Sequence, residues 1–399
     1  MKLTVIIVNY NVRYYLEQCL DSLHKALENV DAEIYVVDNH SRDGSVEYLS
    51  EYSEEIHFIS SSHNLGFARA NNLAIRQCHG DNILLLNPDT LVGGHVIKEC
   101  LQFIENHEKV GAVGVRMLKC DGSDAMESRR GRPTPMTAFY KMIGLCKRFP
   151  LSHRFAHYYM SYLPWDKPVK IEVISGAFFM VRHKLLNEIG LLDEDFFMYG
   201  EDIDLSYRIY KSGWESWYLP QRILHYKGES TQKSSFRYVH VFYEAMLIFF
   251  RKHYGSMGVL FSIPIKLAIY IKAASALFSM FGDKMHKSLG FITNKKKVES
   301  IYYFIGEALQ QFSHLAQSKG IGFKVFEGTE KTLPNGHLQP SIQEAISAEE
   351  GLVNVVYDIR NYSYERILDI FSCNNNKSVH IGTYNPDTNI LITSEEVIA

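Results

Sequence analysis

Three carboxylates lie within four residues of this chain, at Glu201, Asp202 and Asp204, directly after a glycine and at the start of a stretch with helical spacing. A fourth acid, Asp89, closes the turn that follows the very apolar run 83–86. Acids at the ends of two core elements are unusual unless they do chemistry. Together they suggest a metal ion and a general base that serve one reaction.

The first cluster also has a structural explanation. Carboxylates in the first turn of a helix interact favourably with the helix dipole, which explains one acid well and three less well. On a helix Asp202 and Asp204 point about 200° apart, so only one of them can face a cleft. We expect that residue to be Asp202, with Glu201 beside it.

A cation site could be formed by Asp89 and His225. Asp89 could bind a divalent cation, and His225 could complete the site because imidazole is compatible with Mn²⁺. The first four strand–helix units lack both the glycine-rich dinucleotide fingerprint and a P-loop ending, so phosphates would need a partner such as a bound cation. Taken singly, Asp89 is better explained as a turn residue after Pro88, and His225 as a satisfied core or surface histidine.

The elements that would position these residues alternate between strands and helices. Apolar runs predict strands at 3–8, 34–37, 56–59, 83–86, 110–115, 173–181 and 214–219. Helical spacing is found at 16–27, 45–52, 67–77, 184–189 and 203–211. This alternation predicts an α/β fold with a doubly wound, mostly parallel sheet.

Ligands of such sheets bind beyond the carboxyl ends of the strands. The polar clusters of the chain fall there, at Asn9-Tyr10-Asn11, Asp38-Asn39, Asn64 and Asn87-Pro88-Asp89. The Asp38 carboxylate could accept a base N–H from a nucleotide, or it could cap the next helix. Because Ser41 or Asp43 can already cap that helix, Asp38 is left for a ligand.

The composition limits the class of protein. A net charge of −3 argues against bulk binding of nucleic acid, and 13% aromatic residues fit a carbohydrate-binding or membrane-surface protein. The six cysteines have no paired spacing and predict reduced thiols in a cytoplasmic protein. The apolar start of the chain turns polar at Asn9, too early for a signal peptide.

Three regions are expected along the chain: a doubly wound domain at 1–235, a helical segment at 236–317 that could touch a membrane, and a small α/β module at 318–399. The stretch 257–281 is mostly apolar, but Lys266 and Lys272 disfavour a spanning helix, since each central lysine costs about 2.5–3.5 kcal/mol. A helix in the membrane interface and a core helix fit about equally well. The basic cluster 294–297 could touch anionic headgroups, although such a run is more often a solvated surface.

In the module, strands are expected at 323–326, 353–357 and 379–381, and a helix at 364–371 with Ser363 as its cap. We find no catalytic motif there. In the first domain, the irregular loop 121–170 is basic. Its residues Arg129, Arg130 and Arg132 could hold the phosphates of an acceptor, and a solvated loop explains them at least as well.

Residues 1–230 resemble the family 2 glycosyltransferases with a GT-A fold, and the most similar branch is that of bacterial rhamnosyltransferases and related enzymes of surface-polysaccharide assembly. None of the matching pieces is specific alone, but six occur in the right order, and His225 fits the family's late histidine. The six pieces are Val5–Asn11, Val36–Ser41, Asn64–Asn72, Leu86–Asp89, Ser175–Ala177 and Gly200–Leu205.

The resemblance implies roles for these positions. Asp38 would hold the pyrimidine base of a nucleotide-sugar. The other residues expected at the donor are Asn9, Asn64, Gly66, Arg69 and Asn87. Asp89 would bind Mn²⁺ or Mg²⁺ at the diphosphate, with His225 as a second ligand, and Asn87 stands where many relatives have a first Asp. Asp202, next to Glu201, would be the general base, and one base without a nucleophile implies a single displacement with inversion.

The expected activity is transfer of a sugar from dTDP-rhamnose or a UDP-sugar to a hydroxyl of a lipid-linked or polysaccharide acceptor, at the cytoplasmic face of a bacterial inner membrane. Two other classes of protein fit the sequence less well. A sugar-phosphate nucleotidylyltransferase needs a glycine-rich loop with a basic residue after the first strand, which Asn9-Tyr10-Asn11 is not. A non-catalytic nucleotide-sugar-binding or scaffold protein is disfavoured because Asp89, Asp202 and His225 are all present.

Overall fold

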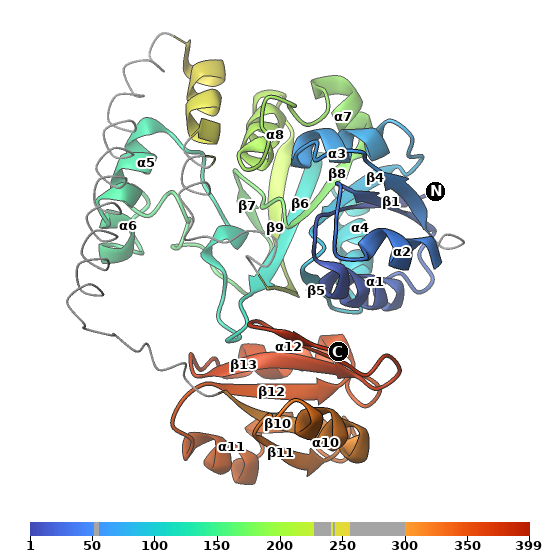
Figure 1. Ribbon diagram of the computed structural model, residues 1–399. Helices are drawn as coiled ribbons and strands as arrows, with labels where there is room; N and C mark the ends of the chain where they lie inside the picture. The colour runs from blue at the N-terminus through green and yellow to red at the C-terminus, as the bar shows by residue number, and fades with distance from the viewer. Residues whose placement is uncertain (52–55, 227–240, 242–243, 256–299) are drawn as a thin grey trace, which may run out of the picture.

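The computed structural model describes residues 1–51, 56–226, 241, 244–255 and 300–399. Within these residues the chain builds two α/β units, each around its own sheet (Figure 1). Residues 257–281 and 294–297, for which the sequence analysis considered membrane contact, lie outside the described residues. None of the helices in the described part has the length and apolar character needed to cross a bilayer.

The first unit contains a sheet with the order β3-β2-β1-β4-β8-β6-β9-β5, and β7 pairs with β9 at its side. Its strands are β1 (Leu3–Asn9), β2 (Ala32–Asp38), β3 (His57–Ser60), β4 (Asn82–Leu86), β5 (Thr90–Val92), β6 (Val110–Leu118), β7 (Val169–Ile171), β8 (Phe178–Arg182) and β9 (Glu215–His225). Its helices are α1 (Arg13–Ala26), α2 (Ser45–Glu51), α3 (Phe67–Ile75), α4 (Val96–Asn106), α5 (Pro135–Met142), α6 (Leu145–Arg148), α7 (His183–Ile189) and α8 (Glu201–Lys211).

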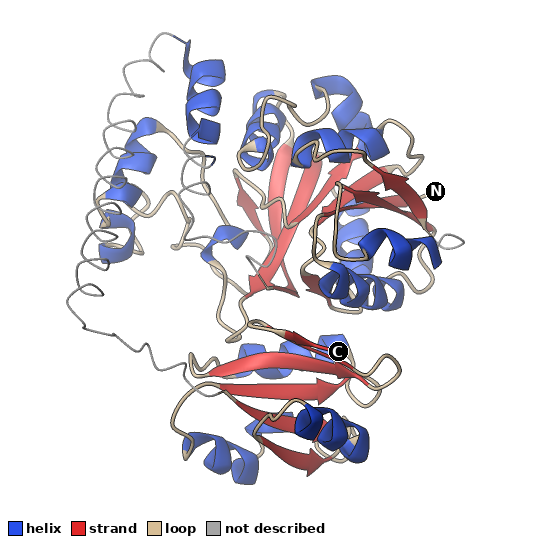
Figure 2. Cartoon of the chain, viewed as in Figure 1, coloured by secondary structure: helices blue, strands red, loops and turns tan. Residues whose placement is uncertain are grey.

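Helices cover the sheet on both faces, as Figure 2 shows. Apolar residues of α1, α2 and α4 pack on one face, and those of α3, α7 and α8 pack on the other. Every residue of β1 is buried, which explains its continuous apolar sequence. The doubly wound α/β fold expected from the sequence is therefore confirmed.

The sheet is more mixed than the sequence suggested. The pairs β1–β2, β1–β4, β2–β3 and β6–β9 are parallel, but β8 runs antiparallel to β4 and β6, and β5 and β7 run antiparallel to β9. A long irregular connection, rather than a crossover helix, leads to β8, so a parallel direction is not imposed.

Two strand boundaries differ from the expected ones. Residues 173–177 form a loop instead of the start of a strand, because the Gly176 N–H binds a side chain rather than a neighbouring strand. Strand β9 continues past the expected end at residue 219 and runs through Pro220 to His225. The register against β6 shifts between Val115 and Arg116, so Pro220 has no partner on β6 and costs no ladder hydrogen bond there.

The second unit contains a sheet with the order β11-β10-β12-β13-β14-β15. Its elements are β10 (Ile301–Gly306), α10 (Leu309–Ser318), β11 (Phe323–Glu327), α11 (Pro340–Ser347), β12 (Val353–Asp358), α12 (Tyr364–Cys373), β13 (Val379–Asn385), β14 (Ile390–Thr393) and β15 (Val397–Ile398). Strand β10 lies between β11 and β12, so the unit begins at Ile301 and not at the expected residue 318. Ser363 caps α12 as expected, since its side chain accepts the Arg366 N–H.

The second unit packs against β5 and β9 of the first. Helix α12 contributes Tyr364, Ile367, Leu368 and Phe371 to an apolar cluster that also holds Leu91, Leu224 and Tyr226. Polar contacts surround this cluster: Arg222 Nη1 lies 2.6 Å from Asp369 Oδ1, and the Tyr364 hydroxyl donates to Asp21 at 2.6 Å. The two units therefore share a core.

Shared packing should couple the stabilities of the two units. Leu368 is fully buried, so Leu368→Ala should cost about 2–5 kcal/mol of unfolding free energy. The three tryptophans, Trp165, Trp214 and Trp217, all lie in the first unit, so their fluorescence reports only on that unit. In urea unfolding, Leu368→Ala should lower the midpoint of the tryptophan transition.

Val325→Ala, at an exposed position of β11, is the matched control and should leave the midpoint nearly unchanged. A tryptophan midpoint that stays the same in Leu368→Ala would show that the units unfold independently.

Candidate active site

Asp89 and His225 meet where strand β5 pairs with the end of β9. Asp89 directly precedes β5, and Thr90 lies opposite His225 in the antiparallel register. Asp89 Oδ1 lies 3.2 Å from His225 Nε2, and Asn87 Nδ2 lies 3.2 Å from the same nitrogen. The turn after β4 and the end of β9 thus bring a carboxylate, an amide and an imidazole to one point.

This donor set fits a divalent cation. Two ligands in adjacent octahedral positions, each about 2.1 Å from the metal, lie about 3 Å apart, close to the separation of Asp89 Oδ1 and His225 Nε2. Among the described residues, no group of three or more acidic, histidine or cysteine side chains is placed to hold a metal. A cation at this pair would therefore take its other ligands from substrate phosphates and water, as Mg²⁺ commonly does.

Asp38 and Asn9 lie side by side at the ends of β2 and β1. Both are fully buried, and the Asp38 carboxylate accepts hydrogen bonds from Asn9 Nδ2 and from the Ser41 N–H, each at 2.9 Å. The Asn9 N–H₂ group also contacts Ser41 Oγ at 3.1 Å, and its Oδ1 has no partner among the described residues. Asp38 therefore fixes the shape of the loop in which a nucleotide base was expected to bind.

The loop before α3 connects this corner to the segment before the acids. Asn64 Oδ1 accepts hydrogen bonds from Asn39 Nδ2 at 3.0 Å and from the Gly66 N–H at 2.9 Å. Gly66 has φ of +80°, and a Cβ there would lie 2.5 Å from the Phe197 carbonyl oxygen, so only glycine fits. Arg69 lies on α3, mostly exposed, with Nε 3.5 Å from a Glu194 oxygen.

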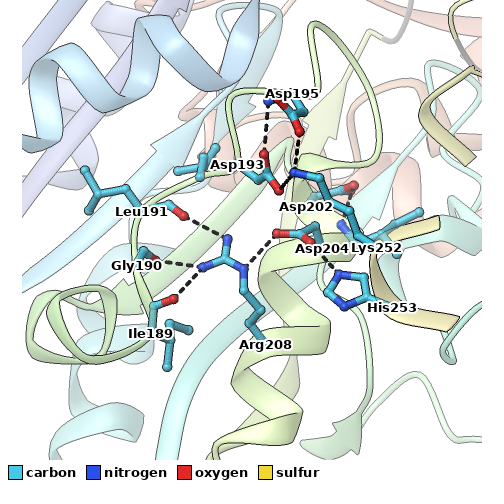
Figure 3. Close-up of polar contacts among 12 residues, drawn as sticks. Ile189, Gly190, Leu191, Asp193, Asp195, Asp202, Asp204, Arg208, Lys252 and His253 are labelled. Carbon is cyan, nitrogen blue, oxygen red and sulfur yellow. Dashed lines mark hydrogen bonds and ion pairs between the residues drawn. The ribbon is translucent and has the colours of Figure 1, made fainter. Parts of the chain in front are cut away.

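The three clustered acids have three different environments. Asp202 forms an ion pair with Arg130, and its Oδ2 accepts the Gly176 N–H at 3.1 Å. Asp204 points the other way and is held by Arg208 Nε at 2.8 Å and His253 Nε2 at 2.6 Å (Figure 3). The expectation that Asp202 and Asp204 face different sides of the helix is confirmed.

Glu201 differs from both neighbours. Its side chain is buried, and its Oε2 has no hydrogen-bond partner among the residues that the structure describes. Burial, with the added repulsion of Asp202, raises the pKa of the Glu201 carboxyl to about 8. At neutral pH Glu201 is therefore mostly protonated, while Asp202 is matched by a guanidinium.

The loop 175–177 connects the acid helix with the cation pair. The Gly176 N–H binds Asp202, and the next residue, Ala177, accepts the Asn87 N–H through its carbonyl at 3.1 Å. A Cβ on Gly176 would meet Asp202 Cβ at 3.5 Å. The Asp202 carboxylate and the turn that carries Asp89 are thus held against successive residues of one loop.

Residues 4–190 match the family model described as Glycosyl transferase family 2. The matched residues make up just under half of the chain and place its first unit in glycosyltransferase family 2. The protein is therefore an enzyme that transfers a sugar from a nucleotide-sugar donor.

Two relatives support the assignment. The chain is 27% identical over 260 residues to an N-acetylglucosaminyl-diphospho-decaprenol L-rhamnosyltransferase of Mycobacterium tuberculosis, over 62% of this chain and 83% of that protein. It is 31% identical over 211 residues to the low-salt glycan biosynthesis hexosyltransferase Agl10 of Haloferax volcanii, over 52% of this chain and 61% of that protein. The solved structure of the mannosyltransferase PcManGT from Pyrobaculum calidifontis, in complex with GDP-Man and Mn²⁺, matches with a TM-score of 0.44 and 17% identity, over 71% of this chain and 80% of that one.

The three arginines expected on the acceptor side of the glycosyltransferase have different surroundings. Arg129 is fully buried, donates to the Pro164 carbonyl at 2.8 Å and lies 3.4 Å over the Trp165 ring, so it packs inside the protein and does not face an acceptor. Arg132 pairs with Glu172 at 3.1 Å. Arg130 alone of the three contacts the acid cluster.

Sequence reasoning missed two contacts of the glycosyltransferase site. Gly176 was quoted as part of a motif, but its link to Asp202 was not foreseen. The pairing of His253 with Asp204 was also missed, and the helical residues 244–255 pack on α8 through Phe249 and Phe250. No local signal announces these contacts, because the partners are distant in sequence.

The raised pKa of Glu201 predicts a pH dependence of stability. The folded protein holds this proton up to about pH 8, whereas an unfolded glutamate releases it near 4.5. The folded state therefore loses stability as the pH rises from about 4.5 to 8. Glu201→Gln stays neutral throughout and should reduce the fall of the melting temperature between pH 5.5 and 8.5.

Glu28→Gln, at an exposed position after α1, is the control and should leave the fall in melting temperature unchanged. Equal falls in the wild type and Glu201→Gln would mean that Glu201 is ionised in the folded enzyme.

Proposed function

We propose that this glycosyltransferase moves a sugar from a nucleoside diphosphate to a hydroxyl of a lipid-linked or polysaccharide acceptor in cell-surface glycan biosynthesis. The transfer inverts the configuration at the anomeric carbon. The observation that carries the proposal is the loop 175–177, which contacts the Asp202 carboxylate on one side and the Asn87-Pro88-Asp89 turn on the other. A base and a cation site that are both held by this loop can act on one sugar.

Asp202 acts as the general base. Its side chain is partly exposed, and Arg130 and the Gly176 N–H hold its carboxylate in place. The incoming hydroxyl gives its proton to Asp202 while its oxygen attacks the anomeric carbon. Glu201 is disfavoured as a nucleophile, because burial raises the pKa of its carboxyl above the usual range and so opposes the ionised form. One base without a nucleophile gives a single displacement and inversion.

Asp89 and His225 would hold a Mn²⁺ or Mg²⁺ ion at the diphosphate, with Asn87 against the imidazole. Such an ion would supply positive charge against the negative charge that the leaving nucleoside diphosphate gains. Asn87 is neutral, so the cation site has a single carboxylate, that of Asp89, and depends more on the phosphates.

The nucleotide binds at the corner formed by Asn9 and Asp38. Asn9 Oδ1, which has no partner among the described residues, and the Asp38 carboxylate are acceptors for the N–H of a pyrimidine. Asn64, Gly66 and Arg69 line the rest of the donor. dTDP-rhamnose and UDP-sugars both suit this corner, and the name of the Mycobacterium tuberculosis relative favours rhamnose as the sugar and a polyprenyl diphosphate as the acceptor carrier.

Replacing Asp202 distinguishes an enzyme from a protein that only binds the nucleotide-sugar. Asp202→Asn should lower the rate of sugar transfer by about 10²–10⁴-fold, because the amide cannot accept the proton, and it should leave the donor dissociation constant nearly unchanged. Donor turnover and calorimetric donor binding, measured with dTDP-rhamnose and UDP-sugars, test this.

Asp195→Asn, at an exposed acid of the preceding loop, is the matched control and should keep wild-type turnover. Turnover in Asp202→Asn equal to that of the wild type would remove Asp202 from the mechanism.

Loss of a cation ligand should appear as weaker metal binding. His225→Ala should raise at least tenfold the Mn²⁺ concentration that gives half-maximal turnover, because one of two protein ligands is removed. The direct measurement is Mn²⁺ binding by electron paramagnetic resonance in the presence of a nucleoside diphosphate. His107→Ala, at an exposed histidine after α4, should bind Mn²⁺ like the wild type, and an unaltered Mn²⁺ affinity in His225→Ala would place the metal elsewhere.

A further inference from the structure

The segment between Glu127 and Asp166 contains no acid but seven cations: Arg129, Arg130, Arg132, Lys141, Lys147, Arg148 and Arg154. The first three are accounted for by burial or by ion pairs in the protein. Lys147, Arg148 and Arg154 are exposed, and none of them has a carboxylate partner among the described residues. The segment thus presents positive charge that the rest of the described protein does not neutralise.

The same segment exposes large apolar side chains. Five of the nine large hydrophobic residues that are exposed in the described chain fall within it: Met136, Phe139, Ile143, Phe149 and Leu151. Three of them, Met136, Phe139 and Ile143, recur at helical spacing along α5 and its end, and each is about half exposed. Leu151 is 77% exposed. Water-facing side chains of this size, gathered in one short segment, usually mark a binding surface.

The buried side of this segment is already packed. Tyr140, Cys146 and Tyr158 form a small core beneath α5 and α6. The exposed apolar residues lie outside this core and keep much of their surface toward water. Figure 1 places α5 and α6 at the edge of the first unit, away from the second unit.

We propose that residues 136–154, here named the 136–154 surface, dock on an anionic lipid bilayer. Met136, Phe139, Ile143, Phe149 and Leu151 enter the headgroup region, and Lys147, Arg148 and Arg154 bind the lipid phosphates. Apolar side chains next to unpaired cations are the combination that binds anionic membrane interfaces. The sequence had placed membrane contact in 257–281, so this surface is a separate one.

The residues on either side of the surface in the chain reach the acid cluster. Pro133 and Tyr158 line an apolar pocket together with Gly200 and Ile203, which lie on either side of Glu201 and Asp202 in the chain. A bilayer at this surface would present the lipid end of an acceptor close to Asp202. This link to the acceptor rests on the proposed function, whereas docking on lipid does not.

Binding to vesicles tests the proposal with the full-length protein. The wild type should co-sediment with phosphatidylcholine vesicles that contain 30% phosphatidylglycerol, and much less with phosphatidylcholine alone. Phe139→Asp/Ile143→Asp and Lys147→Glu/Arg148→Glu should each weaken binding roughly tenfold or more. The charge variant should also lose most of the salt dependence.

The controls change comparable residues on the second unit. Val325→Asp replaces an exposed apolar residue of β11, and Lys377→Glu replaces an exposed lysine before β13; both should bind vesicles like the wild type. Near-ultraviolet circular dichroism checks that all variants are folded. Wild-type binding in both double variants, or equal binding of the wild type to neutral and anionic vesicles, would overturn the proposal.

A second measurement separates this inference from the proposed function. Sugar transfer to a short, water-soluble acceptor should persist in Phe139→Asp/Ile143→Asp, while transfer to a vesicle-embedded acceptor should fall with binding. If binding to anionic vesicles depends on the 136–154 surface but no acceptor receives a sugar, the membrane-docking proposal stands and the proposed reaction is refuted.

Discussion

The position of the Asp202 carboxylate is the constraint on which the rest of the site depends. A base acts only within hydrogen-bond reach of the proton that it removes, so the carboxylate must be held firmly. Arg130 and the Gly176 N–H hold one oxygen, and the first turn of α8 holds the other. Because the next residue of the Gly176 loop contacts the turn of Asp89, fixing the base also fixes its place relative to the cation pair.

Three acids in one helical turn behave differently because their surroundings differ. Asp204 is buried but keeps its charge, since Arg208 and His253 offer donors on both of its oxygens. Glu201 is buried with little compensation, so it takes up a proton instead. Asp202 combines partial exposure with a guanidinium partner. The helical period separates these environments, so one short sequence supplies an acid bonded on both oxygens, a buried acid with a raised pKa and the carboxylate that we propose as the base.

Much of this arrangement could be predicted from local patterns. The continuous apolar runs of β1 and β4 identify buried strands, and polar residues at or shortly after their ends, such as Asn9 and Asp89, fall at the ligand-binding edge of the sheet. The antiparallel direction of β8 could not be predicted, because it depends on a long irregular connection. The surroundings of Arg129 and Arg130 could not be predicted either. These residues are adjacent in sequence, but Arg129 is buried in the core, whereas Arg130 pairs with Asp202 on the distant helix α8.

The second unit shows how a segment without catalytic residues can still bear on the site. Asp89 and His225 belong to the β5–β9 pair, and a three-residue strand such as β5 pairs too briefly to hold its place alone. Val92 and Ile223 face the core of the first unit, while Leu91 and Leu224 face α12 of the second. The pair thus packs between two apolar cores, and both cores help to hold the carboxylate and the imidazole 3.2 Å apart.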